Sequence, residues 1–337
     1  MPITRAYGQA SQLGNTPAAS NPVLNSAFDI WQRGTSIASG AGAPYTADRW
    51  QIFRSGAASG ATVSRQTTSD TTNLPFIQYS ARVQRDSGNT STAALHLTNN
   101  FETVNSIPYA GKTVTLSFYA RKGANYSSAS NLLNANIRTG TGTDQTWVGG
   151  YTGLATPLSA DVTLTDTWQR FSASATLSAS LTELAVQFAY NPVGTAGAND
   201  WFEVTGVQID IGSVALPYRR NSATLAGELA ACQRYYQRFT EDVAYTALLI
   251  GGANQTSTIV LGASLLVPMR TSPTFATANT YVYSVNNVQT VTSYTNRSSK
   301  TNVSVLANVS TTASSGDHGR LEGVGSSNGY VEMSAEL

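Results

Sequence analysis

Histidine, the side chain most often used for acid–base chemistry near neutral pH, occurs only at His96 and His318. His96 lies in an apolar, strand-like run, ALHL, where structural packing is the usual role of a histidine. Residues Gly325 to Gly329 read GSSNG and satisfy the G-x-S-x-G pattern of a serine nucleophile. This segment lacks the strand-then-helix context of such a nucleophile, and no histidine follows it. We therefore predict that the chain is not an enzyme.

Patterns for metal and nucleotide binding are also missing from the sequence. It contains no C-x-x-C, no H-E-x-x-H and no complete G-x-G-x-x-G segment. We predict no catalytic residue, no cofactor and no metal ligand. A glycosidase-type carboxylate pair stays open as an alternative, because its separation is set in space and not along the chain.

Residues 140–153, GTGTDQTWVGGYTG, have the side-chain types that bind sugars. Trp147 and Tyr151 offer aromatic faces for the C–H groups of a sugar ring, while Asp144 and Gln145 offer partners for its hydroxyls. Tyr126, in KGANYSS, is a second candidate platform. The alternative is that Trp147 packs into the core, which is the commoner position of a large aromatic side chain. The exposure of Trp147 and Tyr151 distinguishes the two interpretations.

Strands with alternating apolar and polar residues must position these side chains. The alternation is clearest at residues 113–120, where Val114, Leu116 and Phe118 fall on one face. It recurs in three later segments, 171–177, 184–190 and 207–211. Strands of this kind, separated by turns rich in Gly, Asn and Ser, predict antiparallel sheets packed face to face. We predict an all-β chain that begins with a jelly-roll sandwich.

One helix is predicted, from about Ser222 to Phe239, between two strand-rich regions. Its apolar stripe consists of Leu225, Leu229, Cys232 and Tyr236, which gives Cys232 a core-packing role, and its candidate caps are Asn221, Ser222 and Thr224. The predicted organisation is a docking arm at residues 1–20, a jelly roll at 21–220, a linker helix at 221–239 and a second, smaller β-sandwich at 240–337.

The composition excludes several classes of partner. Charged residues make up 12% of the chain, and 20 basic against 19 acidic side chains leave a net charge of +1, so no field attracts nucleic acid or an acidic membrane. No stretch reaches the roughly 18 apolar residues of a membrane span, and residues 1–20 lack the apolar region of a signal peptide. The single cysteine, Cys232, cannot form an intrachain disulfide, which suits assembly in a reducing cytosol.

Several segments, taken in order, resemble virion proteins of tailed bacteriophages. They are NPVLNSAFDIWQRGTS (21–36), YTADRW (45–50), ARVQRDSGNTSTAALHL (81–97), GKTVTLSFYARKG (111–123), DTWQRFSASATL (166–177), VTGVQIDIGSVALPYRR (204–220), LAACQRYYQRF (229–239), VPMRTSPTF (267–275) and the terminal VEMSAEL. No single motif is diagnostic, but the ordered set is hard to imitate. The likeness covers about residues 21–337 and leaves out the arm.

The resemblance implies a tail fibre-like appendage whose first domain is similar to a carbohydrate-binding-module jelly roll. It also implies a homotrimer that contacts host-surface polysaccharide during adsorption without hydrolysing it. We expect the arm to dock on other virion proteins, and the chain to be assembled in the host cytoplasm and displayed on the exterior of the phage particle. The alternative function is purely structural, as a collar, a connector, or a capsid decoration or head-fibre subunit.

Overall fold

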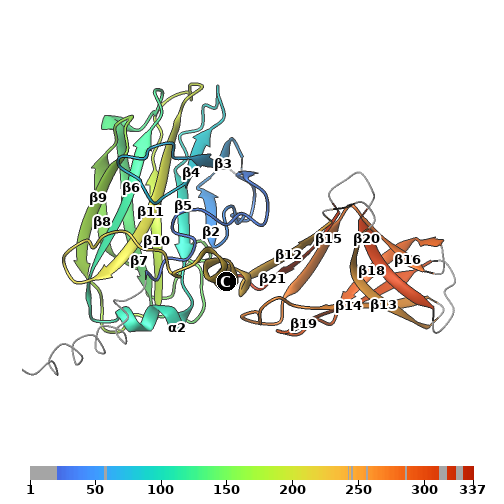
Figure 1. Cartoon of the computed structure of the whole chain (residues 1–337). Helices are drawn as coiled ribbons and strands as arrows, with labels where there is room; N and C mark the ends of the chain where they lie inside the picture. The colour runs from blue at the N-terminus through green and yellow to red at the C-terminus, as the bar shows by residue number, and fades with distance from the viewer. Residues whose placement is uncertain are drawn as a thin grey trace, which may run out of the picture. The chain divides into compact units, whose positions relative to one another are not determined.

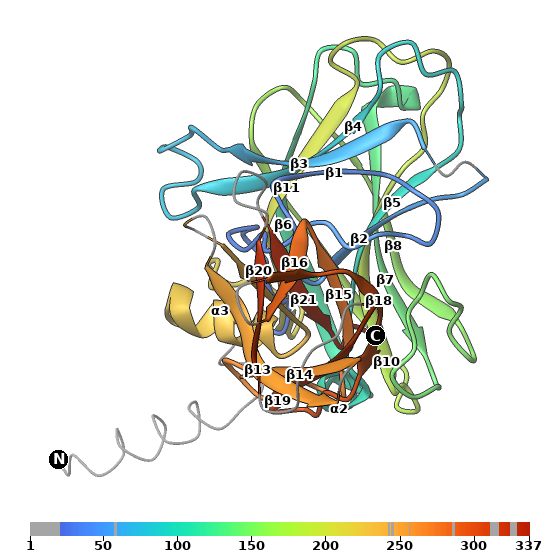
Figure 2. The ribbon, with the colours of Figure 1, turned by 90° about the vertical axis from the view of Figure 1, so that its right-hand side faces the viewer.

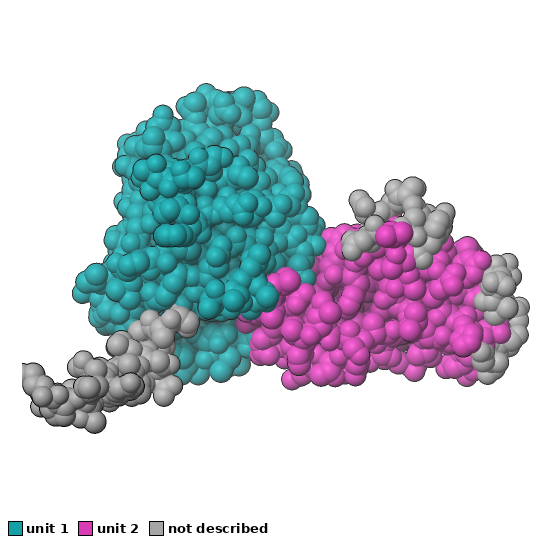
Figure 3. Space-filling view, in the orientation of Figure 1, with its two compact units in different colours: residues 1–228, 337 teal, residues 229–336 magenta. Residues whose placement is uncertain are grey.

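The computed structural model of the chain describes residues 21–56, 59–241, 243, 246–255, 257–284, 287–310, 317–323 and 329–337. The predicted arm, and the GSSNG turn apart from Gly329, lie outside these residues. The chain forms two compact units, residues 1–228 with Leu337 and residues 229–336, which Figure 3 shows in different colours. No helix in the described part of the chain is long and apolar enough to cross a membrane.

Unit 1 is built from two antiparallel sheets, whose strands are labelled in Figure 1 except for β1, which is labelled in Figure 2. Sheet I has the order β1 (Ser36–Ala38), β3 (Ala61–Thr67), β4 (Tyr79–Arg85), β11 (Trp201–Ile211), β6 (Thr113–Lys122) and β9 (Gln169–Thr176). Sheet II has the order β2 (Trp50–Arg54), β5 (Leu95–Asn100), β10 (Glu183–Tyr190), β7 (Leu132–Gly140) and β8 (Ala155–Thr163). Short helical turns, α2 (Thr103–Ser106), η2 (Ile107–Tyr109) and η3 (Ala129–Asn131), connect strands.

The strand order identifies the architecture. Strands β4 to β11 contribute β4-β11-β6-β9 to sheet I and β5-β10-β7-β8 to sheet II. Two antiparallel sheets that share eight strands in this interleaved way form a jelly roll. The predicted jelly-roll sandwich is therefore confirmed.

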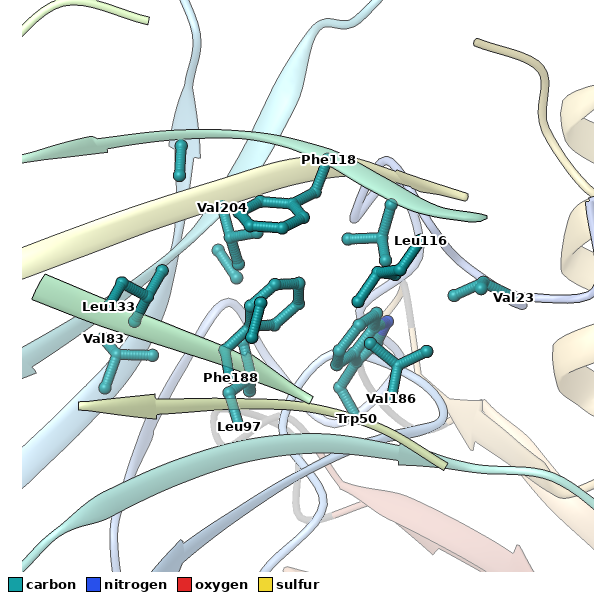
Figure 4. Packing of buried hydrophobic residues seen from close by; sticks show 14 of the residues in the cluster. Val23, Trp50, Val83, Leu97, Leu116, Phe118, Leu133, Val186, Phe188 and Val204 are labelled. Carbon is teal, nitrogen blue, oxygen red and sulfur yellow. The ribbon is translucent and has the colours of Figure 1, made fainter. Parts of the chain in front are cut away.

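The core of unit 1 lies between the two sheets, because alternate side chains of each strand face the opposite sheet. Phe118 of β6 and Phe188 of β10 meet across the sandwich with ring centroids 4.8 Å apart (Figure 4). Trp50 of β2 lies 6.3 Å from Phe188. Val114, Leu116 and Phe118 are all buried, as their alternation predicted. Burying an aliphatic or aromatic side chain of this size contributes about 1.5–3 kcal/mol.

The predicted helix is shorter than the sequence suggested. Helix α3 spans Leu225–Gln233 (labelled in Figure 2), and strand β12 follows at Tyr236–Thr240. Thr224 is the cap, since its Oγ1 accepts a hydrogen bond from the Gly227 N–H at 3.1 Å. The correction at the C-terminal end comes from pairing with β21, because aromatic residues such as Tyr236 and Phe239 favour a strand once a partner is available.

Unit 2 is the second, smaller sandwich that the sequence predicted. Sheet III has the order β12, β21 (Tyr330–Ser334) and β15 (Thr274–Ala278). Sheet IV has the order β17 (Asn287–Gln289), β16 (Thr280–Ser284), β20 (His318–Gly323), β13 (Ala247–Gln255), β14 (Thr258–Ser264), β19 (Asn302–Val309) and β18 (Val291–Asn296). Its core includes Leu261, Val305, Leu321 and Met333.

Candidate functional site

Tyr126 and Tyr151, two of the predicted sugar platforms, are core residues with 6% of their surface exposed. The Tyr126 ring stacks on Tyr190 with centroids 4.5 Å apart, and its hydroxyl donates to the Leu132 carbonyl at 2.9 Å. The Tyr151 hydroxyl donates to Asn100 Oδ1 at 3.2 Å. A buried tyrosine that finds a hydrogen-bond partner inside the protein is a stable packing element. Their burial corrects the prediction that these two rings stack on a sugar.

Asp144 and Gln145 hold the loop between β7 and β8 in place. Asp144 Oδ1 accepts from the Thr103 N–H at 3.0 Å, and Thr103 Oγ1 accepts from the Asp144 N–H at 2.8 Å. The Gln145 side chain bonds both the N–H and the hydroxyl of Thr152, at 2.8 and 3.0 Å. The Gln145 N–H donates to Glu183 Oε1 at 3.3 Å. These residues therefore position Trp147, which lies between them and Thr152 in the loop.

Trp147 is half-buried on the outer face of sheet II, the face that points away from the core. The backbone N–H of Trp147 donates to Asn100 Oδ1 at 2.9 Å. Its ring centroid lies 5.0 Å from that of His96 and 5.8 Å from that of Phe53, in an edge-on arrangement with Phe53. The Arg138 guanidinium lies 5.6 Å from the Trp147 ring, a cation–π distance. Trp147 is thus neither a core residue of the sandwich nor a free surface side chain.

The outer face of sheet II carries two rows of side chains that run across all its strands. The strand register aligns one row, called here the polar row, from Gln51, Thr98, Gln187, Asn136 and Ser159. It aligns the next row, called here the aromatic row, from Phe53, His96, Ala189, Asn134 and Asp161. Together with Trp147 and Arg138 these rows form the polar face.

Three buried polar atoms of the polar face have no hydrogen-bond partner among the protein atoms: Gln187 Nε2, Asn136 Oδ1 and His96 Nδ1. The opposite end of the Gln187 amide is heavily used, since its Oε1 accepts from Arg138 Nη2 at 2.9 Å and from Asn136 Nδ2 at 3.3 Å. Arg138 Nε also donates to Gln187 Oε1, at 3.1 Å. A buried, unpaired polar atom costs about 1–3 kcal/mol. Such atoms are uncommon in native proteins, so a group of them marks a place where a polar ligand or water completes the bonding.

The titratable groups of this face are tuned by burial. Burial, and secondarily the positive charge of Arg138, lower the pKa of His96 to about 4, so its ring is neutral at neutral pH. Burial also lowers the pKa of Arg138. Burial raises the pKa of Glu183, whose Oε2 has no hydrogen-bond partner. Within the described ranges, no group of His, Cys, Asp and Glu side chains is arranged to hold a metal ion.

A hollow of about 250 Å³ adjoins one end of the aromatic row. Asn134 and Asp161 belong both to the row and to the lining of the hollow, which Pro192 and Val193 continue. Between Asn134 and His96 the aromatic row contains only Ala189, whose small side chain fills little of the space above the sheet. The polar face therefore connects the half-buried Trp147 cluster to an open hollow.

The outer face of sheet I offers a comparison, because it also carries a half-buried tryptophan, Trp201. The Arg82 guanidinium lies 4.1 Å from the Trp201 ring, as a cation–π pair. Glu203 is fully buried, and its two oxygens accept from Arg82 at 2.6 Å and from Arg121 at 2.7 Å. The charges beside Trp201 are therefore paired with one another, whereas the amides and the imidazole beside Trp147 leave donor and acceptor atoms unused.

Sequence reasoning identified Trp147 but missed His96, Gln187, Asn136 and Arg138. His96 was assigned to packing, and its ring does contact Trp147, but on the outer face of the sheet. One signal was available for Gln187. The alternation at residues 184–190 places Val186 and Phe188 in the core and therefore Gln187 outside it. That Asn136 and His96 lie on the two strands that flank β10 could not be read from the sequence.

No protein-family model matches the chain, and no curated protein sequence matches it significantly. Among solved structures, a carbohydrate-binding module described as "CBM4 structure and function" is 21% identical, with 56% of this chain and 99% of that chain covered and a TM-score of 0.35. The xylan-binding domain CBM22-1 of Paenibacillus barcinonensis is 13% identical over 53% of this chain and 95% of that chain, with a TM-score of 0.32.

A third similar structure is the enzymatically active domain of tailspike protein 4 of bacteriophage CBA120. It is 14% identical, with 49% of this chain and 19% of that chain covered and a TM-score of 0.34. Likenesses at this level say nothing about the ligand or activity of the present chain.

Proposed function

We propose that unit 1 binds a glycan on the polar face without hydrolysing it. The observation that carries this proposal is the group of unpaired buried atoms, Gln187 Nε2, Asn136 Oδ1 and His96 Nδ1, beside the aromatic ring of Trp147. Sugar hydroxyls donate and accept hydrogen bonds, and the C–H face of a sugar ring stacks on an aromatic ring. A ligand of this class supplies what each of these atoms lacks.

The strand register sets the spacing of the binding atoms. Gln187 and Asn136 face each other across β10 and β7, where directly opposed residues have Cβ atoms about 4.5–5.5 Å apart. Neighbouring hydroxyls of one sugar residue can therefore use both, with the amide N–H of Gln187 donating to one oxygen and Asn136 Oδ1 accepting from the other hydroxyl. The neutral His96 ring accepts or donates at a third position.

Binding requires neighbouring side chains to move, because the unpaired atoms are buried. The hydrogen bonds of Asp144 and Gln145 hold the backbone of the loop that carries Trp147, so the movement is one of side chains. Trp147 then closes over the sugar as its stacking partner.

The carboxyl groups of the polar face support binding without hydrolysis. The strand register places Asp161 in the same row as Ala189 of β10. Glu183 lies six residues before Ala189 on β10, so at about 3.3 Å per residue Asp161 and Glu183 are about 20 Å apart along the strand direction. Glycosidase carboxyl pairs lie about 5–10 Å apart. Asp144 is closer to Glu183, since both accept hydrogen bonds from Thr103, so this pair is the carboxyl arrangement that an assay for released oligosaccharides tests.

Replacing Gln187 by Glu is expected to weaken glycan binding about tenfold or more, the cost of one hydrogen bond to a charged or buried partner. The change removes the Nε2 donor but keeps the shape of the side chain and its contact with Arg138. Gln187 is fully buried, so the new carboxylate loses hydration and gains an ion pair with Arg138, and the free energy of unfolding is measured beside the affinity. Bacterial cell-surface polysaccharides on an array identify a ligand, and calorimetry with that ligand measures the affinity.

The matched control is Gln84→Glu, on the outer face of sheet I. A second pair of variants, Trp147→Ala and Trp201→Ala, compares the two half-buried tryptophans in the same way. Loss of binding only in Gln187→Glu and Trp147→Ala supports the proposal. Equal binding by Gln187→Glu and wild type, or no binding of any glycan by the wild-type chain, overturns it.

The resemblance to tailed-phage virion proteins supports a more specific role. We propose that the chain is a tail fibre-like subunit on the exterior of a phage particle, that it forms a homotrimer, and that its arm docks on other virion proteins. Host-surface polysaccharide is then the natural ligand of the polar face. The alternative is a purely structural subunit: a collar, a connector, or a capsid decoration or head-fibre subunit. This alternative does not explain why the buried polar atoms of the polar face have no hydrogen-bond partner.

The purified chain is expected to block adsorption of the phage that carries it, because it occupies the same receptor. The Gln187→Glu chain should block adsorption far less well, while Gln84→Glu should block it as the wild type does. Adsorption is measured as the fraction of plaque-forming particles left in solution. Equal blocking by all chains would assign adsorption to another surface, and no blocking by any chain would favour the structural alternative.

A further inference from the structure

Unit 2 contains a hollow of about 350 Å³ that the function of unit 1 does not use. It is lined by the turn between β15 and β16 and by the strand ends of β17 and β18. The principal lining residues are Asn279, Thr280, Tyr281, Gln289, Thr292 and Tyr294. Its volume falls at the lower end of the range of roughly 300–1,000 Å³ typical of small-molecule sites.

The chemistry of the lining is uniform. Its polar side chains are hydroxyls and carboxamides, its aromatic side chains are the rings of Tyr281 and Tyr294, and Val291 and Ala278 add small apolar surfaces. No Asp, Glu, Lys or Arg is among these lining residues. Each polar group can donate or accept, which matches a ligand whose hydroxyls do the same. A charged ligand would find no counter-charge here.

Two local departures from regular backbone shape the hollow. The register of β18 against β19 shifts between Val291 and Ser293, so Thr292 is the extra residue of a β-bulge. Bulges re-aim side chains and are enriched beside functional sites. Asn279, in the turn between β15 and β16, has a φ of +53°, a left-handed conformation that only a few per cent of non-glycine residues adopt. Both irregular residues line the same hollow.

The phenol of Tyr294 is held in a fixed position at this hollow. Burial raises the pKa of Tyr294, and the side chain of Thr280 lowers it. Thr280 Oγ1 lies 2.7 Å from Thr277 Oγ1. Thr277 in turn donates to the Tyr330 carbonyl at 2.8 Å. On its other side the Tyr294 ring packs on Phe275 with centroids 5.4 Å apart. A side chain fixed in this way loses little conformational freedom when a ligand binds.

We infer that this hollow is a second binding site, for one neutral sugar residue. The half-buried ring of Tyr294 or Tyr281 stacks on the sugar, and the carboxamide of Asn279 bonds its hydroxyl groups. The Thr292 hydroxyl, which donates to the Asn308 carbonyl at 3.1 Å, accepts from one of them. The inference is independent of the polar face, because every residue that it uses lies in unit 2.

The test uses the full chain with the substitution Trp147→Ala, so that unit 1 does not contribute to the signal. The probes are D-glucose, D-galactose and N-acetyl-D-glucosamine, with D-glucuronic acid as the charged comparison, and the measurement is saturation-transfer NMR. At least one neutral probe is expected to give a signal, and the acid a weaker one.

Thr292→Phe fills the hollow and is expected to reduce the signal to that of buffer. Thr295→Phe is the matched control, because Thr295 is exposed on the same edge strand, β18, and does not line the hollow. Both variants should keep the unfolding midpoint of the parent chain. A wild-type signal from Thr292→Phe, an equal loss in both variants, a stronger signal from the acid, or no signal from any neutral probe would overturn the inference.

Discussion

Replacing Arg85 by Met is expected to lower the free energy of unfolding of unit 1 by about 3–5 kcal/mol. Arg85 and Asp200 form an ion pair at 2.8 Å in which both side chains are fully buried. Arg85 Nη1 also donates to Ser127 Oγ at 3.0 Å, and Arg85 Nη2 donates to the carbonyls of Asn89, Ser91 and Gly194, at 2.8, 2.8 and 3.0 Å. One guanidinium therefore joins several loops at one end of the jelly roll.

The large effect follows from what the substitution leaves behind. Asp200 keeps its hydrogen bonds from Ser127 and Tyr190 but loses the cation paired with it, so a carboxylate remains buried in a medium of low polarity. Met fills a similar volume, so the cost comes from the unpaired charge and the three released carbonyls. Chemical denaturation followed by near-ultraviolet circular dichroism measures the change.

Arg82→Met is the matched control, since Arg82 also pairs with a buried carboxylate but is 24% exposed, and Glu203 keeps Arg121 when Arg82 is removed. The expected loss there is about 1 kcal/mol. The double variant Arg85→Met with Asp200→Asn should recover part of the stability of Arg85→Met, because no charge is then left unpaired. Equal losses in Arg85→Met and Arg82→Met would contradict this account.

Acidification from pH 6.5 to pH 4 is expected to cost unit 1 up to about 3 kcal/mol through His96 alone. The pKa of His96 in the folded protein is about 4, against an ordinary value of 6.5. Between pH 6.5 and 4, His96 is protonated in the unfolded chain but neutral in the folded chain, so acidification favours unfolding. The loss grows until the pH reaches about 4 and then levels off, because both states are protonated below that value.

The physical cause is the environment that makes His96 part of the polar face. Burial removes water from the ring, and the Arg138 guanidinium opposes a second positive charge. His96→Gln should therefore show a shallower loss of stability between pH 6.5 and 4 than wild type. Carboxyl groups titrate equally in both chains, so the difference between the two urea-unfolding series reports His96.

His318→Gln is the control, since His318 is exposed in unit 2. Its stability should follow the wild-type curve at every pH. Parallel curves for wild type and His96→Gln would show that His96 keeps its ordinary pKa in the folded protein. That result would contradict the buried environment described for its ring.

Some features of this protein follow from local sequence alone. The alternation of apolar residues at 113–120 determined which side chains of β6 face the core, because strand side chains point alternately to opposite faces. Cys232 is buried, as its place on the predicted apolar stripe suggested, but Leu225 of the same stripe is 54% exposed. Thr224 capped the helix as its side-chain chemistry allows. The all-β class and the face-to-face packing of antiparallel sheets followed from many such strands with no long helix between them.

Other features depended on partners that are distant in the sequence. The helix predicted to reach Phe239 ends at Gln233, because β21, about a hundred residues later, pairs with the segment that follows. Tyr126 and Tyr151 have the loop neighbours of an exposed platform, yet Tyr190 and Asn100 enclose them. Local composition contains no information about these contacts.

The polar face is the clearest case of a feature that only the tertiary structure decided. Gln51, Thr98, Asn136 and Gln187 come from four strands spread over more than a hundred residues, and each is an ordinary outward-facing polar residue in its own strand. They become a candidate site only because the jelly-roll order places β2, β5, β10 and β7 side by side in register. Arg138 then occupies one end of the Gln187 amide and leaves the other unpaired, which depends on geometry across strands and not on any motif.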